Sequence, residues 1–217
     1  MFDPREQVHV YTGDRPDLWP YIPQGTGRML DVGCATGEVG VALKRERGVR
    51  EVVGLEFSPR AAAEARRRLD QVVEGDVETL DAPYPDGYFD LLLYADVLEH
   101  LRNPWDVATR QRRLLRPGGL VVASLPYIGH YSTILMLLRH QWRYAERGIM
   151  DSTHLRFFDR AGLLDLFHRA GYREARLYRR GGQGPKQRLL RALTLGYSTE
   201  FFIPGYVVVA RNPAISR

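Results

Sequence analysis

The sequence has little cysteine, almost no lysine and no long apolar run. Because Cys34 is the only cysteine among the 217 residues, an intramolecular disulfide is excluded, as is typical of proteins in reducing compartments. The longest apolar run, residues 134–138, ends at Arg139 and falls far short of the roughly 18–20 residues that span a membrane. The opening residues 1–5 are polar and lack the apolar centre of a signal peptide. These absences predict a soluble protein in the cytoplasm.

Lysine is scarce, because only Lys44 and Lys186 are lysines among the 31 basic residues. The other basic residues are arginines, and against 26 acidic residues they give a formal net charge of +5. An anionic partner such as nucleic acid is one explanation for so many arginines. The arginines are spread along the chain among the acids, however, which favours a solvated surface. Nucleic acid is therefore not the expected partner.

Hydrophobic residues make up 44% of the sequence, enough for a buried core, and the length fits one domain that comprises residues 1–217. Short apolar segments, typical of buried parallel strands, lie at residues 28–32, 51–55, 71–74, 89–94 and 120–125. Helical segments separate them at residues 38–47, 58–69 and 104–115. Later in the chain come a helix and two strands, at residues 160–171, 173–179 and 205–211. This alternation predicts an α/β fold with a doubly wound, mostly parallel seven-stranded sheet of the Rossmann-like kind.

The alternation breaks between residues 126 and 158, directly after the fifth predicted strand. Residues 131–139 within this segment resemble a short apolar helix. We expect that helix to be buried against the core or against a second copy of the chain, with contact to a lipid surface as the alternative. The whole segment is predicted to be an inserted lid. A second irregular stretch, residues 180–194, is predicted to form a loop and a short helix.

A glycine-rich turn, DVGCATG at residues 31–37, joins the first predicted strand to the first helix. Such a turn lets a ligand approach the backbone and the free N–H groups of the helix N-terminus. A dinucleotide fingerprint would place glycines at 33, 35 and 38, but the chain has Gly33, Ala35 and Glu38. A carboxylate at 38 would repel a pyrophosphate, which disfavours a nicotinamide oxidoreductase. Asp31 instead suits a cofactor that has no phosphate and carries a cationic end.

This turn, together with acids at the ends of the next two predicted strands, resembles the pattern of class I S-adenosylmethionine-dependent methyltransferases over about residues 28–180. The resemblance implies S-adenosylmethionine (SAM) as cofactor, with S-adenosyl-L-homocysteine as product. It implies that Glu56 holds the ribose hydroxyls, that Asp76 binds the adenine amino group and that Phe57 packs against adenine. Ala35 departs from the family, which usually has glycine there. The implied cofactor residues are Asp31, Gly33, Cys34, Ala35, Gly37, Glu56, Phe57, Asp76, Val77 and Ala95.

Further segments narrow the class of acceptor. Residues 94–97 read YADV instead of the Asn/Asp-Pro-Pro-aromatic motif of amide N-methyltransferases, and no second cysteine is present for cytosine C5 methylation. Residues 96–101, DVLEHL, resemble a segment of ubiquinone-pathway O-methyltransferases. Residues 124–131, 142–144 and 151–158 resemble methyltransferases associated with bacterial glycosyltransferases, and also the methionine-biosynthesis protein W family. The resemblance implies methyl transfer to a small molecule and favours oxygen as the acceptor atom.

Three histidines, His154, His130 and His100, are candidates for a catalytic base, because a hydroxyl acceptor needs a base with a pKa near neutrality. They follow strand ends or lie in the insertion, at the sheet edge where ligands of doubly wound folds gather. A structural or substrate-orienting role is the alternative for each. Glu99 beside His100 suggests a metal ion, but neighbours on a helix point apart and the sequence offers no evident third ligand. We therefore expect no metal.

The insertion, residues 126–158, is also the predicted acceptor site. Its aromatic side chains would stack on a ring of the acceptor, and its arginines would pair with an acidic group. Closure of the core over the sheet is the alternative role for the aromatics. The candidate substrate residues are Tyr127, Tyr131, Trp142, Arg143 and Arg156.

Two other functions are compatible with the sequence. One is an RNA methyltransferase that uses the arginine surplus, which predicts steeply salt-dependent RNA binding. The other is a methyltransferase fold that binds SAM and a partner protein without turnover, as the resemblance to the protein W family permits. A homodimer and peripheral contact with a membrane are further expectations for the chain.

Overall fold

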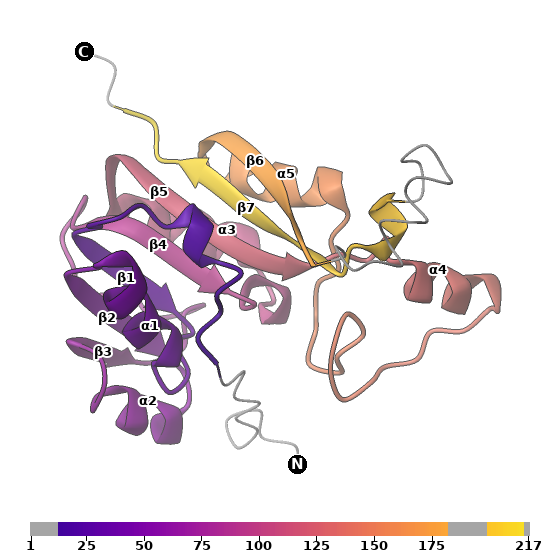
Figure 1. The fold of residues 1–217 in the computed structure, drawn as a ribbon, viewed down its shortest axis with the longest axis horizontal. Coiled ribbons are helices and arrows are strands. Elements are labelled where there is room, and N and C mark those ends of the chain that lie inside the picture. The colour runs from indigo at the N-terminus through magenta and orange to yellow at the C-terminus, as the bar shows by residue number, and fades with distance from the viewer. Residues whose placement is uncertain (1–12, 182–198, 215–217) are drawn as a thin grey trace.

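The computed structural model describes residues 13–181 and 199–214 (Figure 1). Within them, seven strands form one sheet in the order β3-β2-β1-β4-β5-β7-β6. Neighbouring strands run parallel, except that β7 is antiparallel to both β5 and β6. This confirms the predicted seven-stranded, mostly parallel sheet. The strands are β1 (Arg28–Val32), β2 (Glu51–Glu56), β3 (Gln71–Glu74), β4 (Phe89–Ala95), β5 (Leu115–Pro126), β6 (Arg173–Arg180) and β7 (Gly205–Arg211).

Helices cover both faces of this sheet. Side chains alternate between the two faces along a strand, so a strand with a helix on each side is apolar throughout. In β4, Leu93 packs in the same buried cluster as Leu43 of α1, whereas Tyr94 packs with Leu163 of α5. The described helices are α1 (Glu38–Arg47), α2 (Pro59–Ala65), α3 (Pro104–Gln111), α4 (Tyr131–Leu138) and α5 (Arg160–Arg169).

The boundary between α3 and β5 differs from the prediction. The helix expected to reach residue 115 ends at Gln111, and a 3-10 turn, Arg112–Leu114, follows. The strand expected to begin at residue 120 already begins at Leu115, which pairs with Phe89 of β4. Gly118 and Gly119, which follow the predicted helix, lie within β5, and the Gly118 N–H donates to the carbonyl of residue 212 at 2.9 Å.

The segment between β5 and α5 stands apart from the sheet. In Figure 1, α4 projects beyond the end of β5. Leu135, Leu137 and Leu138 are 43%, 50% and 71% exposed, and within α4 only Thr133 is buried. The expected burial of this helix against the core is therefore wrong, while contact with a second copy stays a prediction. The loop and helix predicted at residues 180–194 lie mostly outside the described residues.

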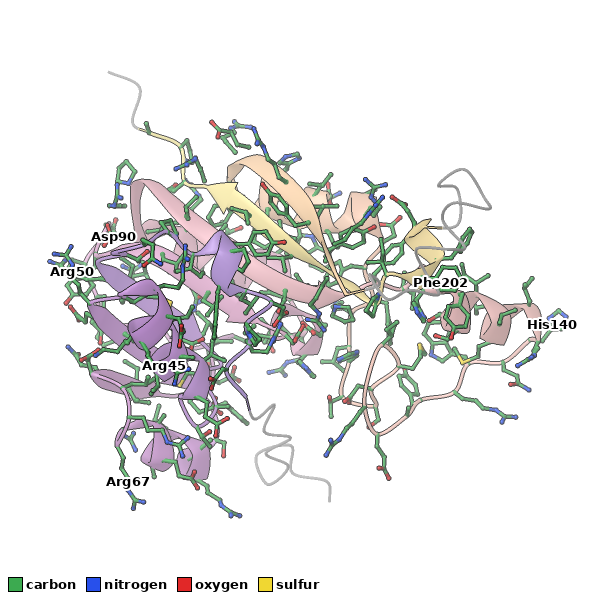
Figure 2. All side chains as sticks on the ribbon, viewed as in Figure 1. Arg45, Arg50, Arg67, Asp90, His140 and Phe202 are labelled. Atoms are coloured by element: carbon green, nitrogen blue, oxygen red, sulfur yellow. The ribbon has the colours of Figure 1, made fainter. Side chains whose placement is uncertain are left out.

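Arginines extend from the surface, as Figure 2 shows for Arg45, Arg50 and Arg67. Arg45 pairs with Asp14 at 2.8 Å, with both side chains more than half exposed. Exposed pairs of this kind contribute only about 0–1 kcal/mol each to stability. Within the described parts of the chain, no helix has the length and apolar character needed to cross a membrane.

Candidate cofactor site

The glycine-rich turn between β1 and α1 has a left-handed backbone. Gly33, Ala35 and Gly37 have φ values of 68°, 48° and 83°. The Gly33 N–H donates to the Leu55 carbonyl at 2.7 Å, and a Cβ at residue 33 would lie 2.7 Å from a methyl carbon of Val97. Residue 33 must therefore be glycine, because φ is positive there and because a side chain would collide with Val97. Ala35 holds the same left-handed conformation in spite of its side chain.

We expect Ala35→Gly to raise the free energy of unfolding by up to about 1 kcal/mol. The substitution relieves a left-handed alanine, which costs roughly 1–2 kcal/mol, and it makes the unfolded chain more flexible by roughly 0.4–1 kcal/mol. Ala63→Gly is the matched control, because Ala63 is exposed in α2 and glycine there costs about 1 kcal/mol. Urea unfolding measures both changes. Equal destabilisation by the two substitutions would contradict strain at residue 35.

Asp31 is a buried carboxylate that lacks a full set of partners. Its side chain lies near the carboxyl end of β1, is 1% exposed, and its Oδ2 accepts no hydrogen bond. Burial, reinforced by the nearby charge of Glu56, raises the pKa of Asp31 to about 7. Such a group is stabilised when a cation lies beside it. The ammonium group of SAM is a cation of the required kind, so the residues present fit this cofactor.

Glu56 ties the turn to the end of β2. Its Oε2 accepts from the Ala35 N–H at 2.9 Å, and its Oε1 accepts from the Ser58 N–H at 2.8 Å. These bonds hold the carboxylate at the strand end with lone pairs still free for further donors. The next residue, Phe57, is 40% exposed and open to a ligand.

Asp76 and Val77 follow β3. The Oδ1 of Asp76 accepts from the Glu78 N–H at 2.8 Å, and its Oδ2 lies 3.9 Å from a nitrogen of Arg102. The Asp76 carboxylate is half-buried and within reach of a ligand. The side chain of Val77, by contrast, is 7% exposed and packs in the core cluster that contains Leu30.

A cavity at the carboxyl ends of β1 and β4 brings together five of the ten predicted cofactor residues, namely Asp31, Gly33, Cys34, Ala35 and Ala95. Burial raises the pKa of the Cys34 thiol, which disfavours a role as a nucleophile. The other predicted cofactor residues lie outside this lining. The cavity is also lined by residues that the sequence analysis did not assign to the cofactor, namely Arg15, Thr36, Glu38, Val39 and Asp96.

Arg15 and Asp96 are the functional candidates that sequence reasoning missed. Arg15 Nη1 donates to Asp96 Oδ2 at 2.7 Å, and Arg180 Nη1 donates to Asp96 Oδ1 at 2.6 Å. Arg15 Nη2 also donates to the Ser124 hydroxyl at 3.0 Å. The segment before β1 thus crosses the carboxyl ends of β4 and β5. Residues 15 and 96 are far apart in the sequence. Only Asp96 was noted from the sequence, as the first residue of the DVLEHL segment.

The structure brings two of the three candidate histidines together. The rings of His100 and His154 are 4.8 Å apart between centroids, and Glu99 lies beside them. His130 instead caps α4, where its Nδ1 accepts from the Ser132 N–H at 3.4 Å. Burial lowers the pKa of His100, with a smaller contribution from His154. We expected no metal because the sequence offered no evident third ligand beside Glu99 and His100. In the structure, His154 is a third candidate ligand.

The predicted acceptor residues fall into separate groups. Tyr127 packs against Tyr206 with ring centroids 5.2 Å apart, and Tyr131 packs against residue Phe202 at the same distance. Trp142 packs against Phe157, also at 5.2 Å. The Arg156 side chain donates to the Arg102 carbonyl at 3.1 Å, whereas Arg143 is exposed and its backbone N–H donates to Met136 Sδ.

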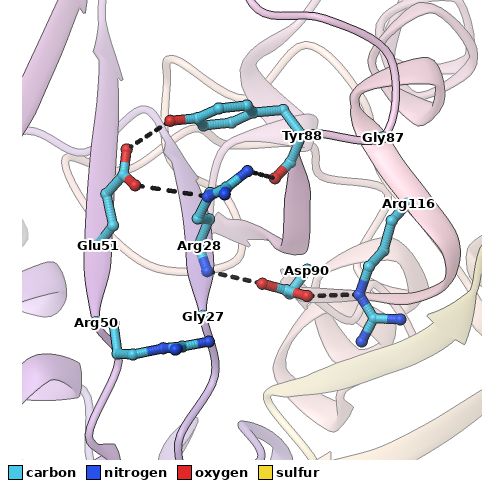
Figure 3. Close-up of a pocket in the computed structure, with 8 residues that line it drawn as sticks. All are labelled: Gly27, Arg28, Arg50, Glu51, Gly87, Tyr88, Asp90 and Arg116. Carbon is cyan, nitrogen blue, oxygen red and sulfur yellow. Dashed lines mark hydrogen bonds and ion pairs between the residues drawn. The ribbon is translucent and has the colours of Figure 1, made fainter.

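A larger cavity, of about 530 Å³, lies at the opposite edge of the sheet (Figure 3). It is formed where β1, β2 and β4 begin, whereas ligands of doubly wound folds bind where the strands end. Both of its acids are in ion pairs, since Asp90 lies 2.5 Å from Arg116 and Glu51 lies 3.7 Å from Arg28. This cavity is therefore not the cofactor site.

The strand order with its antiparallel β7, and a buried acid behind a glycine-rich turn, define a class I SAM-dependent methyltransferase. A family model described as a methyltransferase domain matches residues 5–175, and the chain belongs to this family.

Curated relatives support the same family. The chain is 33% identical over 98 residues to 27-O-demethylrifamycin SV methyltransferase of Amycolatopsis mediterranei, covering 42% of this chain and 36% of that one. It is 29% identical over 161 residues to ubiquinone biosynthesis O-methyltransferase of Cereibacter sphaeroides, covering 71% and 64%. The chain thus spans less than two thirds of either relative's length. A SAM-dependent methyltransferase structure from Archaeoglobus fulgidus shares the fold, with a TM-score of 0.69, 18% identity, and coverage of 90% and 91%.

Proposed function

We propose that the chain transfers a methyl group from SAM to an oxygen atom of a small-molecule acceptor. The observation that carries the cofactor half of this proposal is the buried, partly unpaired carboxylate of Asp31 beside the glycine-rich turn. Two relatives are named 27-O-demethylrifamycin SV methyltransferase and ubiquinone biosynthesis O-methyltransferase. These names support a small-molecule acceptor and methyl transfer to oxygen.

SAM supplies an activated methyl group on a positively charged sulfur. Asp31 would hold the ammonium end of the cofactor, Glu56 the ribose hydroxyls and Asp76 the adenine amino group. Phe57 would cover the adenine ring from the exposed side. The protein aligns the acceptor oxygen with the methyl carbon and keeps water away, which is the main contribution that a methyltransferase makes.

The acceptor is proposed to lie between the cofactor cavity and the insertion at residues 126–158. His100 and His154 would activate its hydroxyl, because His100 lies in the 3-10 turn that follows β4 and the ring of His154 packs against it. Trp142 would also contact the acceptor. It packs against Phe157, whose ring centroid lies 6.3 Å from that of His154. We propose that His130 acts as a helix cap instead of a base.

Calorimetric titration with S-adenosylhomocysteine, beside NAD, tests the cofactor half. We expect micromolar binding of S-adenosylhomocysteine and none of NAD, since Glu38 stands where a pyrophosphate would lie. A panel of hydroxylated quinone precursors, nucleotide sugars and RNA, incubated with deuterated SAM, then identifies the acceptor by mass. Cofactor binding without transfer to any acceptor would favour the partner-binding alternative, and transfer to RNA would overturn the small molecule. The homodimer, the membrane contact and the cytoplasmic location stay predictions.

A further inference from the structure

Three groups that commonly bind metal ions converge beyond the end of β4. Glu99 and His100 lie in a 3-10 turn, Leu98–His100, and His154 lies at the end of the insertion. One ligand atom from each of the three lies within 4.8 Å of the others. Metal ligands at about 2.0–2.2 Å from one ion are separated from each other by about 3–4 Å. Small side-chain rotations therefore suffice to bring these atoms onto a common ion.

The atoms at the centre of this cluster lack partners in the described part of the chain. Glu99 is 0% exposed, and neither of its carboxylate oxygens accepts a hydrogen bond. His154 is 4% exposed, and its Nε2 also has no partner. A buried polar group without a partner costs roughly 1–3 kcal/mol, and a carboxylate costs more. Buried atoms without partners on two of the three clustered residues therefore favour a ligand beside them.

The outer nitrogens of both histidines are held by acceptors. His154 Nδ1 lies 3.0 Å from the Ile149 carbonyl, and a carbonyl only accepts, so Nδ1 carries the proton. His100 Nδ1 lies 3.3 Å from the Thr153 carbonyl and 3.0 Å from the Thr153 hydroxyl. In each ring the proton on Nδ1 leaves the lone pair on Nε2, which is the nitrogen that would bind a metal. Metal-binding histidines are oriented in this way by their second nitrogen.

A further hydrogen bond fixes this arrangement. The Thr153 hydroxyl donates to Asp151 Oδ1 at 2.6 Å, so it can only accept from His100. The Asp151 residue is 2% exposed and also accepts from the Thr153 N–H at 2.9 Å. The buried carboxylate, the threonine and the histidine thus form a chain of defined direction, which holds His100 as a neutral ligand with its Nε2 available.

We propose that Glu99, His100 and His154 bind one divalent metal ion of the zinc class. Two imidazoles and one carboxylate suit such an ion, and three protein ligands leave a further coordination position open. His100 is only half-buried, and we place the open position on this more accessible side. The nearest alternative is a protonated Glu99 that lies beside two neutral histidines.

The role of this ion rests on the proposed function. An acceptor hydroxyl bound at the open position becomes more acidic, and its proton passes to solvent. The oxygen lone pair then forms a bond to the methyl carbon of SAM. The carbon–sulfur bond breaks, and its electron pair remains on the sulfur of S-adenosylhomocysteine. The two histidines would then activate the acceptor hydroxyl through the ion instead of acting as bases.

Cobalt titration of the chelator-treated protein tests the site. We expect one Co²⁺ per chain with visible absorption bands typical of nitrogen and oxygen ligands, displaced by Zn²⁺, and a higher melting temperature with Zn²⁺. His154→Ala and Glu99→Gln are expected to weaken binding by more than the roughly 10–100-fold lost with an outer partner. Thr153→Val should fall within that range. His168→Ala is the matched control, since His168 is exposed on α5.

Binding of S-adenosylhomocysteine by each variant shows that it is folded. Wild-type protein that binds S-adenosylhomocysteine but no stoichiometric Co²⁺ would overturn the metal site and leave the proposed function intact. Protein that binds the metal but not S-adenosylhomocysteine would overturn the proposed function alone. Equal Co²⁺ affinity in the wild type and in His154→Ala would place the ion elsewhere and overturn the assignment.

Discussion

Asp31→Asn is expected to weaken binding of S-adenosylhomocysteine by about 100-fold and to abolish its pH dependence. The substitution removes the charge that would pair with the ligand's ammonium group in a buried site, where such a hydrogen bond contributes roughly 1.5–3 kcal/mol. In the wild type, the pKa of Asp31 is raised to about 7. The carboxyl is therefore mostly protonated at pH 6, and binding must release that proton. Affinity should rise by up to about tenfold per pH unit below 7 and level off above it.

Calorimetry between pH 5.5 and 8, in two buffers of different ionisation enthalpy, measures the affinity and the released proton together. Close to one proton should leave at pH 6 and almost none at pH 8. Asp106→Asn is the matched control, because Asp106 is an exposed carboxylate on α3 with a side chain 51% exposed. A wild-type affinity that does not change over this range would contradict the contact with Asp31.

The Asp31 carboxyl makes the ligand-free protein less stable as the pH rises, whereas it makes ligand binding tighter. The pKa of Asp31 in the folded state, about 7, lies above the ordinary value of 3.8. The folded state therefore binds the proton more tightly, so the contribution is favourable at low pH and is lost as the pH rises towards 7. Three pKa units correspond to about 4 kcal/mol, and Asp31→Asn should be more stable than the wild type at pH 8.

Glu56→Ala is expected to weaken binding of S-adenosylhomocysteine by at least about tenfold, since charge-assisted hydrogen bonds to the ribose are lost. The substitution also frees the N–H groups of Ala35 and Ser58, which Glu56 holds at 2.9 and 2.8 Å. Glu56→Gln keeps the shape and one acceptor oxygen, so its loss should be smaller. Circular dichroism confirms folding of both variants. Unchanged affinity in folded Glu56→Ala would remove Glu56 from the cofactor site.

Much of the fold can be predicted from the sequence, because the spacing of apolar residues and the residue types of turns are local properties. The run at β4 is apolar on both faces, and Gly33 and Gly37 mark the turn that follows β1. The end of α3 could not be predicted, since the start of β5 depends on Leu115 pairing with Phe89, a contact across the sheet. The Arg-Pro-Gly-Gly sequence at residues 116–119 is typical of the end of a helix and does not indicate a strand.

The candidate site was predictable only where it lies at strand ends. Asp31 is the last but one residue of β1 and Glu56 is the last of β2, and their positions follow from the parallel sheet. Arg15 reaches the same cavity from a segment without periodicity, so no local pattern could assign it. Glu99 and His100 were expected to point apart as helix neighbours, but they lie in a 3-10 turn, and His154 meets them from the insertion.

The insertion is joined to the sheet at its two ends. The Ile128 N–H donates to the Phe158 carbonyl at 3.0 Å, so the chain leaves and returns at nearly the same place. The entropy of closing such a loop changes slowly with its length, by about 0.6 kcal/mol for each doubling. The residues between these two points can therefore be exchanged for segments of other length and shape while β1, β2 and the glycine-rich turn stay unchanged. With the acceptor proposed to lie against this segment, we expect acceptor range to diverge among related chains while the cofactor site stays the same.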